Sequence, residues 1–518
     1  MRSVPGEGLS PSPEELTYQQ QWLERLQLSE TELARRRCMG VGKGVVVASA
    51  QREQEALDAE LDGFYAGAFT YLMTQYLWQQ TDTIGNAIAQ ITRSIKRLSS
   101  QVPLVDGDRN QSVYFINKRV PPTDAVITKV EGNQATLWLG GVDKESLEAF
   151  QAGAMFTIID ERGQASGKVE LLSRSGLIGE GRLVESGGIA SLQPGMLLQE
   201  ISRVIPADLK LYIGVDPSLE TEGKAAEGAI EAISRLEVVP AQLGNVPYPG
   251  GVHYIFSRMT ANYWQRLSEQ EVVDLPAVGS IGLFTPGLEL VPQSFGEAGE
   301  VVKIAVERLE PKLKSLLATR IIKQTLNANS SQLDVEVSML LVEPPNQVIT
   351  GTATGESRSE LRNSELIYPH RLPVDKLFQF RVTNHESSNL YLTVLLIDSS
   401  GGLVVVFPYQ WPASEESMQL RPNQTLVIGE PQQLKLKAIE KGTGEALVIV
   451  SRSPLKKAVK TLVSLAAELN REQGVVALPE PVEVIGDLLD DLSERAGVAV
   501  RRVSVSEIAT LSLTFEVG

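Results

Sequence analysis

The chain has 518 residues, a formal net charge of −16 at pH 7 and a single cysteine. The acidic charge argues against non-specific binding to nucleic acid or to an anionic membrane, and one cysteine excludes a disulfide framework or a cysteine-ligated metal site. There is no apolar signal-peptide core and no run of about 18 apolar residues, so we expect a cytoplasmic protein without a membrane-spanning helix. The length predicts roughly three to five domains.

The first part of the chain predicts a loop followed by helices. Residues 1–12 are rich in Ser, Pro and Gly and predict a loop. A helix opens at Pro13, with acids in its first turn where the helix dipole favours them, and its apolar side carries Leu16, Trp22, Leu23 and Leu26. Ser29 and Glu32 have the spacing of a capping box, which predicts a second helix.

The next stretch predicts a strand, a polar loop and a helix. Val45–Val47 form a short β-branched run between small residues, which is typical of a strand buried on both faces in a parallel sheet. A charged loop follows over Gln51–Asp62. From Ala68 the apolar residues recur with helical spacing, at Phe69, Leu72, Met73, Tyr76 and Leu77. This order is typical of an α/β unit.

The same residues resemble the small-subunit region of caspase-like cysteine peptidases, above all the cyanobacterial type of bacterial metacaspase (orthocaspase). In that family, a loop of the form Asp-x-Gln-Thr-Ser-Ala-Asp follows a buried strand. Gln54, Ala56 and Asp58 stand where the family has Gln, Ser and Asp, whereas Arg52 and Glu55 depart from it. The match continues at the start of the helix and extends from Met1 to about Gly107.

The resemblance implies an activity and a site. Such enzymes cleave polypeptides after Arg or Lys, and some require calcium, so calcium is the one cofactor that the resemblance implies. It also implies that Gln54 and Asp58 belong to a substrate-pocket loop. The residues alone leave open the alternative that Asp58 is a solvated loop acid. No metal ligand can be assigned.

The catalytic dyad of this family is missing from the sequence. Its cysteine belongs to an Asp-x-Cys-His-Ser-Gly-like motif that precedes the small-subunit region, and no such motif is present. Cys38 lies among arginines at a predicted helix end, and His253, His370 and His385 lie far downstream. Since a Cys/His dyad needs hydrogen-bond reach, we assign no catalytic residue. The missing catalytic half would be a partner on another chain, or lost.

Two domains are predicted after the small-subunit region, which spans residues 1–112. Residues 113–205 carry short strands separated by Gly-rich turns, including a hairpin around Glu131–Asn133, and predict a small β-barrel-like domain. Residues 206–345 predict a mixed α/β domain whose longest helix covers Val301–Leu326, with an apolar stripe along one face.

The last two segments predict more β-structure. Residues 346–455 predict a β-sandwich, in which Leu390–Ile397 pairs with Leu403–Pro408 through an Asp-Ser-Ser-Gly-Gly turn. This block resembles an uncharacterised β-domain that follows the peptidase in many bacterial caspase-like proteins. Residues 456–518 predict a C-terminal helix and strand.

The predicted fold class is therefore an α/β N-terminal part, resembling half of a caspase sheet, followed by mostly β accessory domains. One hypothesis is the C-terminal part of a caspase-like endopeptidase, acting on polypeptides but inactive without its catalytic half. The alternative is a non-catalytic multidomain binding or scaffold protein. A hydrolase built on a downstream histidine is a third. Half a sheet would leave an exposed strand edge, so we expect residues 1–107 to be the least stable part.

Overall fold

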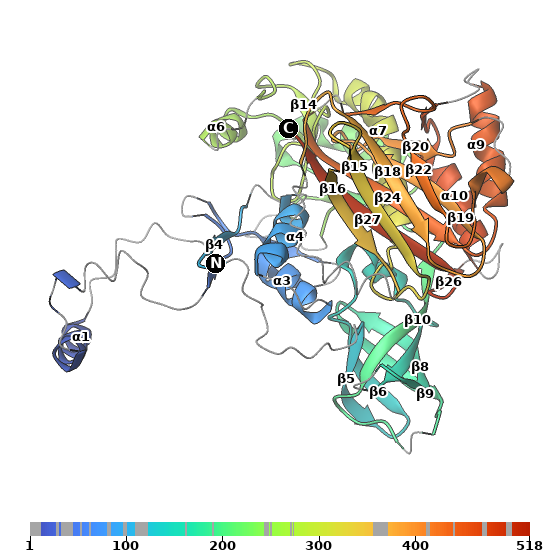
Figure 1. Ribbon diagram of the computed structural model, residues 1–518. Helices are drawn as coiled ribbons and strands as arrows, with labels where there is room; N and C mark the ends of the chain where they lie inside the picture. The colour runs from blue at the N-terminus through green and yellow to red at the C-terminus, as the bar shows by residue number, and fades with distance from the viewer. Residues whose placement is uncertain are drawn as a thin grey trace. The chain divides into compact units, whose positions relative to one another are not determined.

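The computed structural model of the chain (Figure 1) describes 21 segments and contains two compact units. The first unit comprises residues 1–59, 66–77 and 81–117, and the second comprises the remainder. The described residues are 12–26, 29, 31–32, 45–51, 54–61, 64–79, 84–96, 101–108, 123–160, 163–188, 191–242, 248, 251–269, 272, 274–345, 347–355, 371–410, 415–438, 441–468, 474–493 and 500–518.

The first unit is built on a pair of short strands and two helices. Strand β1 (Val46–Ala48) pairs antiparallel with β4 (Leu104–Asp106). Helix α4 (Ile84–Lys96) presents isoleucines at positions 84, 88, 91 and 95, which pack with residues of α3 (Ala68–Gln79) and with Val47 and Val105. The unit also contains α1 (Pro13–Leu26). Strands β2 (Asp58–Glu60) and β3 (Tyr65–Gly67) form a separate two-stranded sheet. The helices predicted from Pro13 and from Ala68 are thus confirmed.

The strand predicted at Val45–Val47 differs from its expected environment. Within the described residues its partner is antiparallel, and Val46 is 65% exposed instead of buried. Side chains alternate along a strand, so Val47 faces the helices while Val46 faces the other side. No described layer covers that side, and the expectation of burial on both faces is therefore wrong for this structure.

The second unit begins with a closed six-stranded β-barrel. Its strands follow the order β10-β5-β6-β9-β8-β7, and pairing of β7 with β10 closes the circle. Short strands joined by tight turns make this closure possible, and Gly132 adopts a positive φ in the predicted hairpin. The barrel comprises β5 (Ala125–Glu131), β6 (Gln134–Trp138), β7 (Met155–Ile159), β8 (Ala165–Ser175), β9 (Ile178–Glu185) and β10 (Leu197–Pro206), with the 3₁₀ helix η1 (Lys144–Ala149) between β6 and β7.

A small α/β layer follows the barrel. Its sheet has the order β12-β11-β13-β14, in which the first three strands are parallel and the last is antiparallel. The 3₁₀ helix η2 and helix α5 connect the parallel strands β11 and β12, as parallel pairing requires, and helix α6 connects β13 to β14. The elements are β11 (Leu211–Val215), η2 (Pro217–Glu222), α5 (Gly223–Glu231), β12 (Leu236–Pro240), β13 (Tyr254–Arg258), α6 (Ala261–Glu269) and β14 (Ile281–Phe284).

Two packed sheets then form the predicted sandwich. Aromatic residues of β18 and β27 meet between them, with the ring centroids of Phe378 and Phe515 6.3 Å apart. One sheet contains β16 (Val348–Ala353), β15 (Val335–Leu341), β18 (Leu377–Asn384), β22 (Thr425–Ile428) and β23 (Leu436–Lys437). The other contains β17 (Arg371–Leu372), β27 (Ile508–Val517), β24 (Gly442–Ser451), β19 (Leu390–Ile397), β20 (Leu403–Phe407), β25 (Val476–Ala477) and β21 (Gln419–Leu420), which follows η3 (Glu415–Met418).

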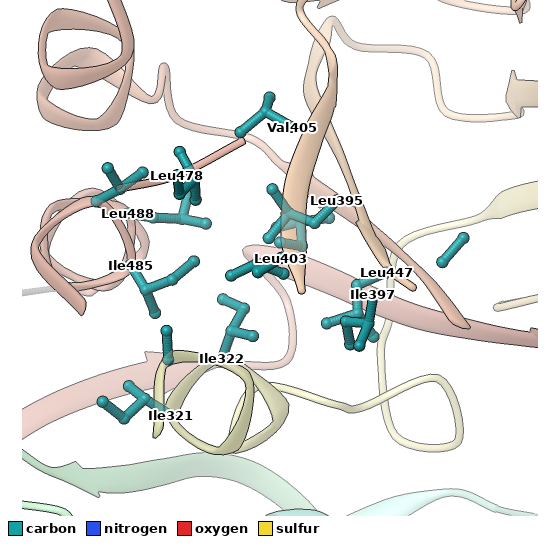
Figure 2. Packing of buried hydrophobic residues seen from close by; sticks show 14 of the residues in the cluster. Ile321, Ile322, Leu395, Ile397, Leu403, Val405, Leu447, Leu478, Ile485 and Leu488 are labelled. Carbon is teal, nitrogen blue, oxygen red and sulfur yellow. The ribbon is translucent and has the colours of Figure 1, made fainter. Parts of the chain in front are cut away.

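Helices cover the outer face of the sheet that contains β19 and β24. Helix α7 (Val302–Lys323), the long helix expected here, lies beside α10 (Pro481–Leu492), which packs against α9 (Lys456–Glu468). Figure 2 shows Ile322 of α7 and Ile485 of α10 directed toward Leu403 of β20. Because this sheet is covered on both faces, its strands read as continuous apolar runs.

The C-terminal strands join the sandwich to the barrel. Strand β26 (Val500–Ser504) pairs with β10 of the barrel, while β27 pairs with β24 over ten residues. Segment 456–518, predicted as a separate helix and strand, therefore contributes an inner strand to the sandwich. The described chain is a mixed α/β protein with many strands, including a barrel and several sheets.

Candidate functional site

Two glutamine side chains, Gln54 and Gln101, fix the loop after β1 through hydrogen bonds to backbone groups. Gln54 Oε1 accepts a hydrogen bond from the backbone N–H of Val102 at 2.9 Å. Gln101 is buried; its Oε1 accepts from the N–H of Leu57 at 2.9 Å, and its Nε2 donates to the carbonyl of Ser49 at 2.6 Å. Both amides thus join the loop after β1 to the segment before β4.

The two predicted pocket residues have different environments in this loop. Gln54 is partly buried and uses its carbonyl oxygen to hold backbone groups, as described above. Asp58 begins β2 and its side chain is exposed. Next to it, the Ala68 N–H donates to the Leu57 carbonyl at 2.9 Å and ties the loop to the start of α3. The structure therefore gives Gln54 an architectural role, and leaves the Asp58 carboxylate accessible to a cation.

Replacing Gln101 by methionine should loosen this loop. The change keeps the volume but leaves the Leu57 N–H and the Ser49 carbonyl without their partner, which costs roughly 1–3 kcal/mol for a buried group. We expect faster amide hydrogen exchange at Leu57 and its neighbours. Gln51→Met, at an exposed position of the same loop, is the matched control and should leave exchange unchanged. Equal exchange in both variants would contradict the bridging role of Gln101.

The histidines do not form a catalytic pair in the described structure. His253 Nδ1 accepts a hydrogen bond from the Tyr212 N–H at 2.9 Å, which anchors the ring at the start of β13. His385 lies after β18, and its Nε2 is 3.6 Å from Glu336 Oε2. Within the described residues neither imidazole hydrogen-bonds to a hydroxyl or thiol, as activation of a nucleophile requires. Cys38 and His370 lie outside the described residues.

His253 should make the stability of the protein depend on pH. Burial, and then the positive charges of Arg320 and Lys144, lower the pKa of this imidazole well below its ordinary value of 6.5. The unfolded chain therefore binds a proton before the folded chain does, and the contribution of His253 is present above pH 6.5 and declines as the pH falls below it. Between pH 7 and pH 5, we expect the free energy of unfolding of the unchanged protein to fall more steeply than that of His253→Gln. The difference between the two slopes should reach up to about 1.4 kcal/mol per pH unit. Identical slopes in urea titrations would refute this.

No metal centre is found in the described part of the chain. Its residues contain no group of three or more His, Cys, Asp or Glu side chains that could hold a metal ion. The same described residues include no helix that is both long and apolar enough to cross a membrane.

A polar cluster at the α/β layer escaped the sequence analysis. Asp216 directly follows β11, and its Oδ2 accepts a hydrogen bond from the Tyr263 hydroxyl at 3.0 Å. The buried Ser257 of β13 lies beside Ser218, with 3.0 Å between the two Oγ atoms. The acid directly after the apolar run Leu211–Val215 was the available signal, but the partners of Asp216 are up to 47 residues away in sequence.

Comparison with known proteins identifies one segment. Residues 371–454 match a family described as a domain of unknown function (DUF4384). No curated protein matches the chain. The matched segment runs from β17 through β24 and lies inside the predicted sandwich, and the description of the family carries no activity.

Proposed function

We propose that this chain provides the small-subunit region and the accessory β-domains of a caspase-like cysteine endopeptidase. A second polypeptide would supply the catalytic cysteine and histidine, and the complex would cleave polypeptides after Arg or Lys in the cytoplasm. Calcium dependence belongs to the same proposal. Asp58 would face the basic side chain of the substrate, while Gln54 would hold the pocket loop in shape.

The observation that carries the proposal is the face of the β1–β4 pair that no described element covers, called here the uncovered face. Val47 and Val105 pack on α3 and α4, whereas Val46 and Leu104, on the opposite face, are 65% and 50% exposed. Large apolar side chains exposed side by side on one face of a strand pair are typical of a surface that binds a partner. Two strands alone are also marginal in stability. A partner that adds strands and a second helical layer would complete this sheet.

Peptide cleavage tests the proposal. The purified chain is incubated with fluorogenic peptides that end in Arg or Lys, with and without calcium. The partner is a polypeptide that carries the family's histidine and Asp-x-Cys-His-Ser-Gly motifs, from an adjacent reading frame. We expect cleavage only when both polypeptides are present. Cleavage by this chain alone, or silence with the partner bound, would contradict the proposal.

A pair of surface variants tests where the partner binds. Val46→Asp places a charge on the uncovered face of β1 and should abolish partner-dependent cleavage, because an unpaired charge is costly in an apolar interface. Val184→Asp, at an exposed position of β9 in the barrel, is the matched control and should leave cleavage unchanged. Equal activity in both variants would remove the β1–β4 face from the proposal.

The second candidate function is a non-catalytic binding or scaffold protein. The observation that favours it is the second unit, whose barrel and sandwich have continuous cores of their own. This hypothesis predicts that the chain folds fully without a partner. Hydrogen exchange discriminates the two: protection of residues 45–108 equal to that of the sandwich, in the isolated chain, would favour the scaffold.

A further inference from the structure

The α/β layer has a place where ligands commonly bind in such sheets, at the carboxyl ends of the neighbouring parallel strands β11 and β13. From β11 the chain runs through η2 and α5 to β12 on one side, and it then returns to β13 on the other side of β11. In open α/β sheets, ligands bind at the carboxyl ends of strands where the strand order reverses in this way. Here those ends carry Asp216 after β11 and Arg258 at the end of β13.

Asp216 is a buried carboxylate without a cationic partner. It is 8% exposed, and its hydrogen bonds come from neutral donors: the Ser218 N–H at 2.9 Å to Oδ1, and the Tyr263 hydroxyl at 3.0 Å to Oδ2. No lysine or arginine of the described chain forms an ion pair with it. Each carboxylate oxygen therefore keeps a lone pair that no donor of the described chain uses.

Tyr248 adds an unpartnered hydroxyl to this site. The side chain is 7% exposed, and its hydroxyl has no hydrogen-bond partner in the described structure. Gly214 of β11 permits the approach of the ring, since a Cβ atom there would lie 2.8 Å from it. Burial, and then the charge of Asp216, raise the pKa of Tyr248, and the same causes raise the pKa of Tyr263 to about 12. Both phenols are therefore protonated and neutral at pH 7.

The rim of the site is accessible from solvent. Ser218, Arg258 and Tyr263, which form this rim, are partly exposed, whereas Asp216 and Tyr248 are buried. Arg258 does not neutralise Asp216, because its guanidinium pairs with Glu222 and donates to the Gly279 carbonyl at 3.1 Å. The guanidinium of Arg258 is therefore held by its own contacts and is not paired with Asp216.

We propose that Asp216, Tyr248 and Tyr263 bind an organic cation, namely a primary ammonium or guanidinium group. Such a group carries several N–H donors, which match the free lone pairs of the carboxylate and the Tyr248 oxygen. The cation comes either from a free amine or from a lysine or arginine side chain of a polypeptide. This inference does not rest on the proposed role in proteolysis.

Titration of the full chain with small probes tests the site. The probes are n-butylamine, n-butylguanidine and Nα-acetyl-lysine methylamide, with 1-pentanol as the neutral control, and binding is followed by calorimetry up to about 10 mM. We expect binding of the cations and none of 1-pentanol. Tighter binding of the blocked lysine than of n-butylamine assigns the cation to a polypeptide, and the reverse assigns it to a free amine. Absence of cation binding overturns the proposal.

Two variants separate binding from folding. Asp216→Asn keeps an acceptor for the Ser218 N–H but removes the charge, so cation affinity should fall at least about tenfold; Asp398→Asn, in an exposed turn of the sandwich, should not change it. Tyr248→Phe should weaken binding about fivefold, yet unfold at no lower urea concentration, because it removes an unsatisfied hydroxyl. Unchanged affinity in either site variant overturns the proposal.

Discussion

Replacing Arg203 by methionine should destabilise the second unit by about 3–5 kcal/mol, because the change leaves a buried carboxylate without its cation. Arg203 and Glu200 are 4% and 1% exposed, and both N–H···O distances of their forked pair are 2.6 Å. The Nη1 atom of Arg203 makes two further donations, to the carbonyls of Gln324 and Leu326 at 2.9 and 2.8 Å. The free energy of unfolding, from urea titration followed by circular dichroism, measures the effect.

An exposed ion pair of the same barrel provides the control. Arg182 donates to Glu170 at 2.9 Å, but both side chains are accessible to water, so Arg182→Met should cost less than about 1 kcal/mol. The double variant Arg203→Met with Glu200→Met removes both buried charges and should recover most of the loss. A loss from Arg203→Met as small as that from Arg182→Met would contradict the importance of the buried pair.

The position of the Glu200–Arg203 pair explains why its loss should also destabilise structure outside the barrel. Glu200 and Arg203 belong to β10, whereas Gln324 and Leu326 follow α7, which packs against the sandwich. Ser330, also after α7, donates to Glu200 at 2.8 Å. The pair therefore satisfies backbone carbonyls at the junction of the barrel with α7, and its removal weakens that junction as well as the barrel.

Removing residues 500–518 should abolish cooperative unfolding of the sandwich. These residues supply β27, which pairs with β24 on one side and with β17 on the other, and β26, which extends the barrel sheet at β10. Without β27, the ladder of β24 is unpaired along ten residues, and an apolar strand edge of this length favours aggregation. We expect a broad, non-cooperative urea transition and loss of soluble protein on heating.

Single substitutions on β27 test how much of this effect comes from its buried side chains. Leu513 is fully buried, so Leu513→Ala should cost about 2–5 kcal/mol through lost transfer energy and a residual cavity. Glu516 is exposed on the same strand, and Glu516→Ala should change stability by no more than about 0.5 kcal/mol. A cooperative transition in the truncated protein, or similar losses in both point variants, would show that the sandwich does not need this strand.

The two proposed sites can be tested independently because they use different parts of the chain. The uncovered β1–β4 face and Asp58 belong to the first unit, whereas Asp216 and Tyr248 belong to the second. Val46→Asp should therefore leave the binding of n-butylamine unchanged, and Asp216→Asn should leave partner-dependent cleavage intact. The segment that matches the domain of unknown function contains neither site.

Local patterns in the sequence determined many of the individual elements. The helices from Pro13 and Ala68, the long helix α7 and the β5–β6 hairpin were all predictable, because capping, apolar spacing and turn residues act over a few positions. The rhythm of short strands also indicated the barrel and the sandwich. These signals depend on neighbours along the chain and not on the final arrangement.

Pairing between distant segments was decided only by the tertiary structure. The apolar run at β1 could not show that its partner is the antiparallel β4, since β-branched residues suit either kind of sheet. Likewise, the pattern of β27 could not show that it lies between β17 and β24, 57 or more residues away along the chain from its nearest ladder partner. The hydrogen bonds of Gln54 to Val102 and of Tyr263 to Asp216 were also decided only by the tertiary structure, because contacts between residues far apart in sequence leave no periodic signal.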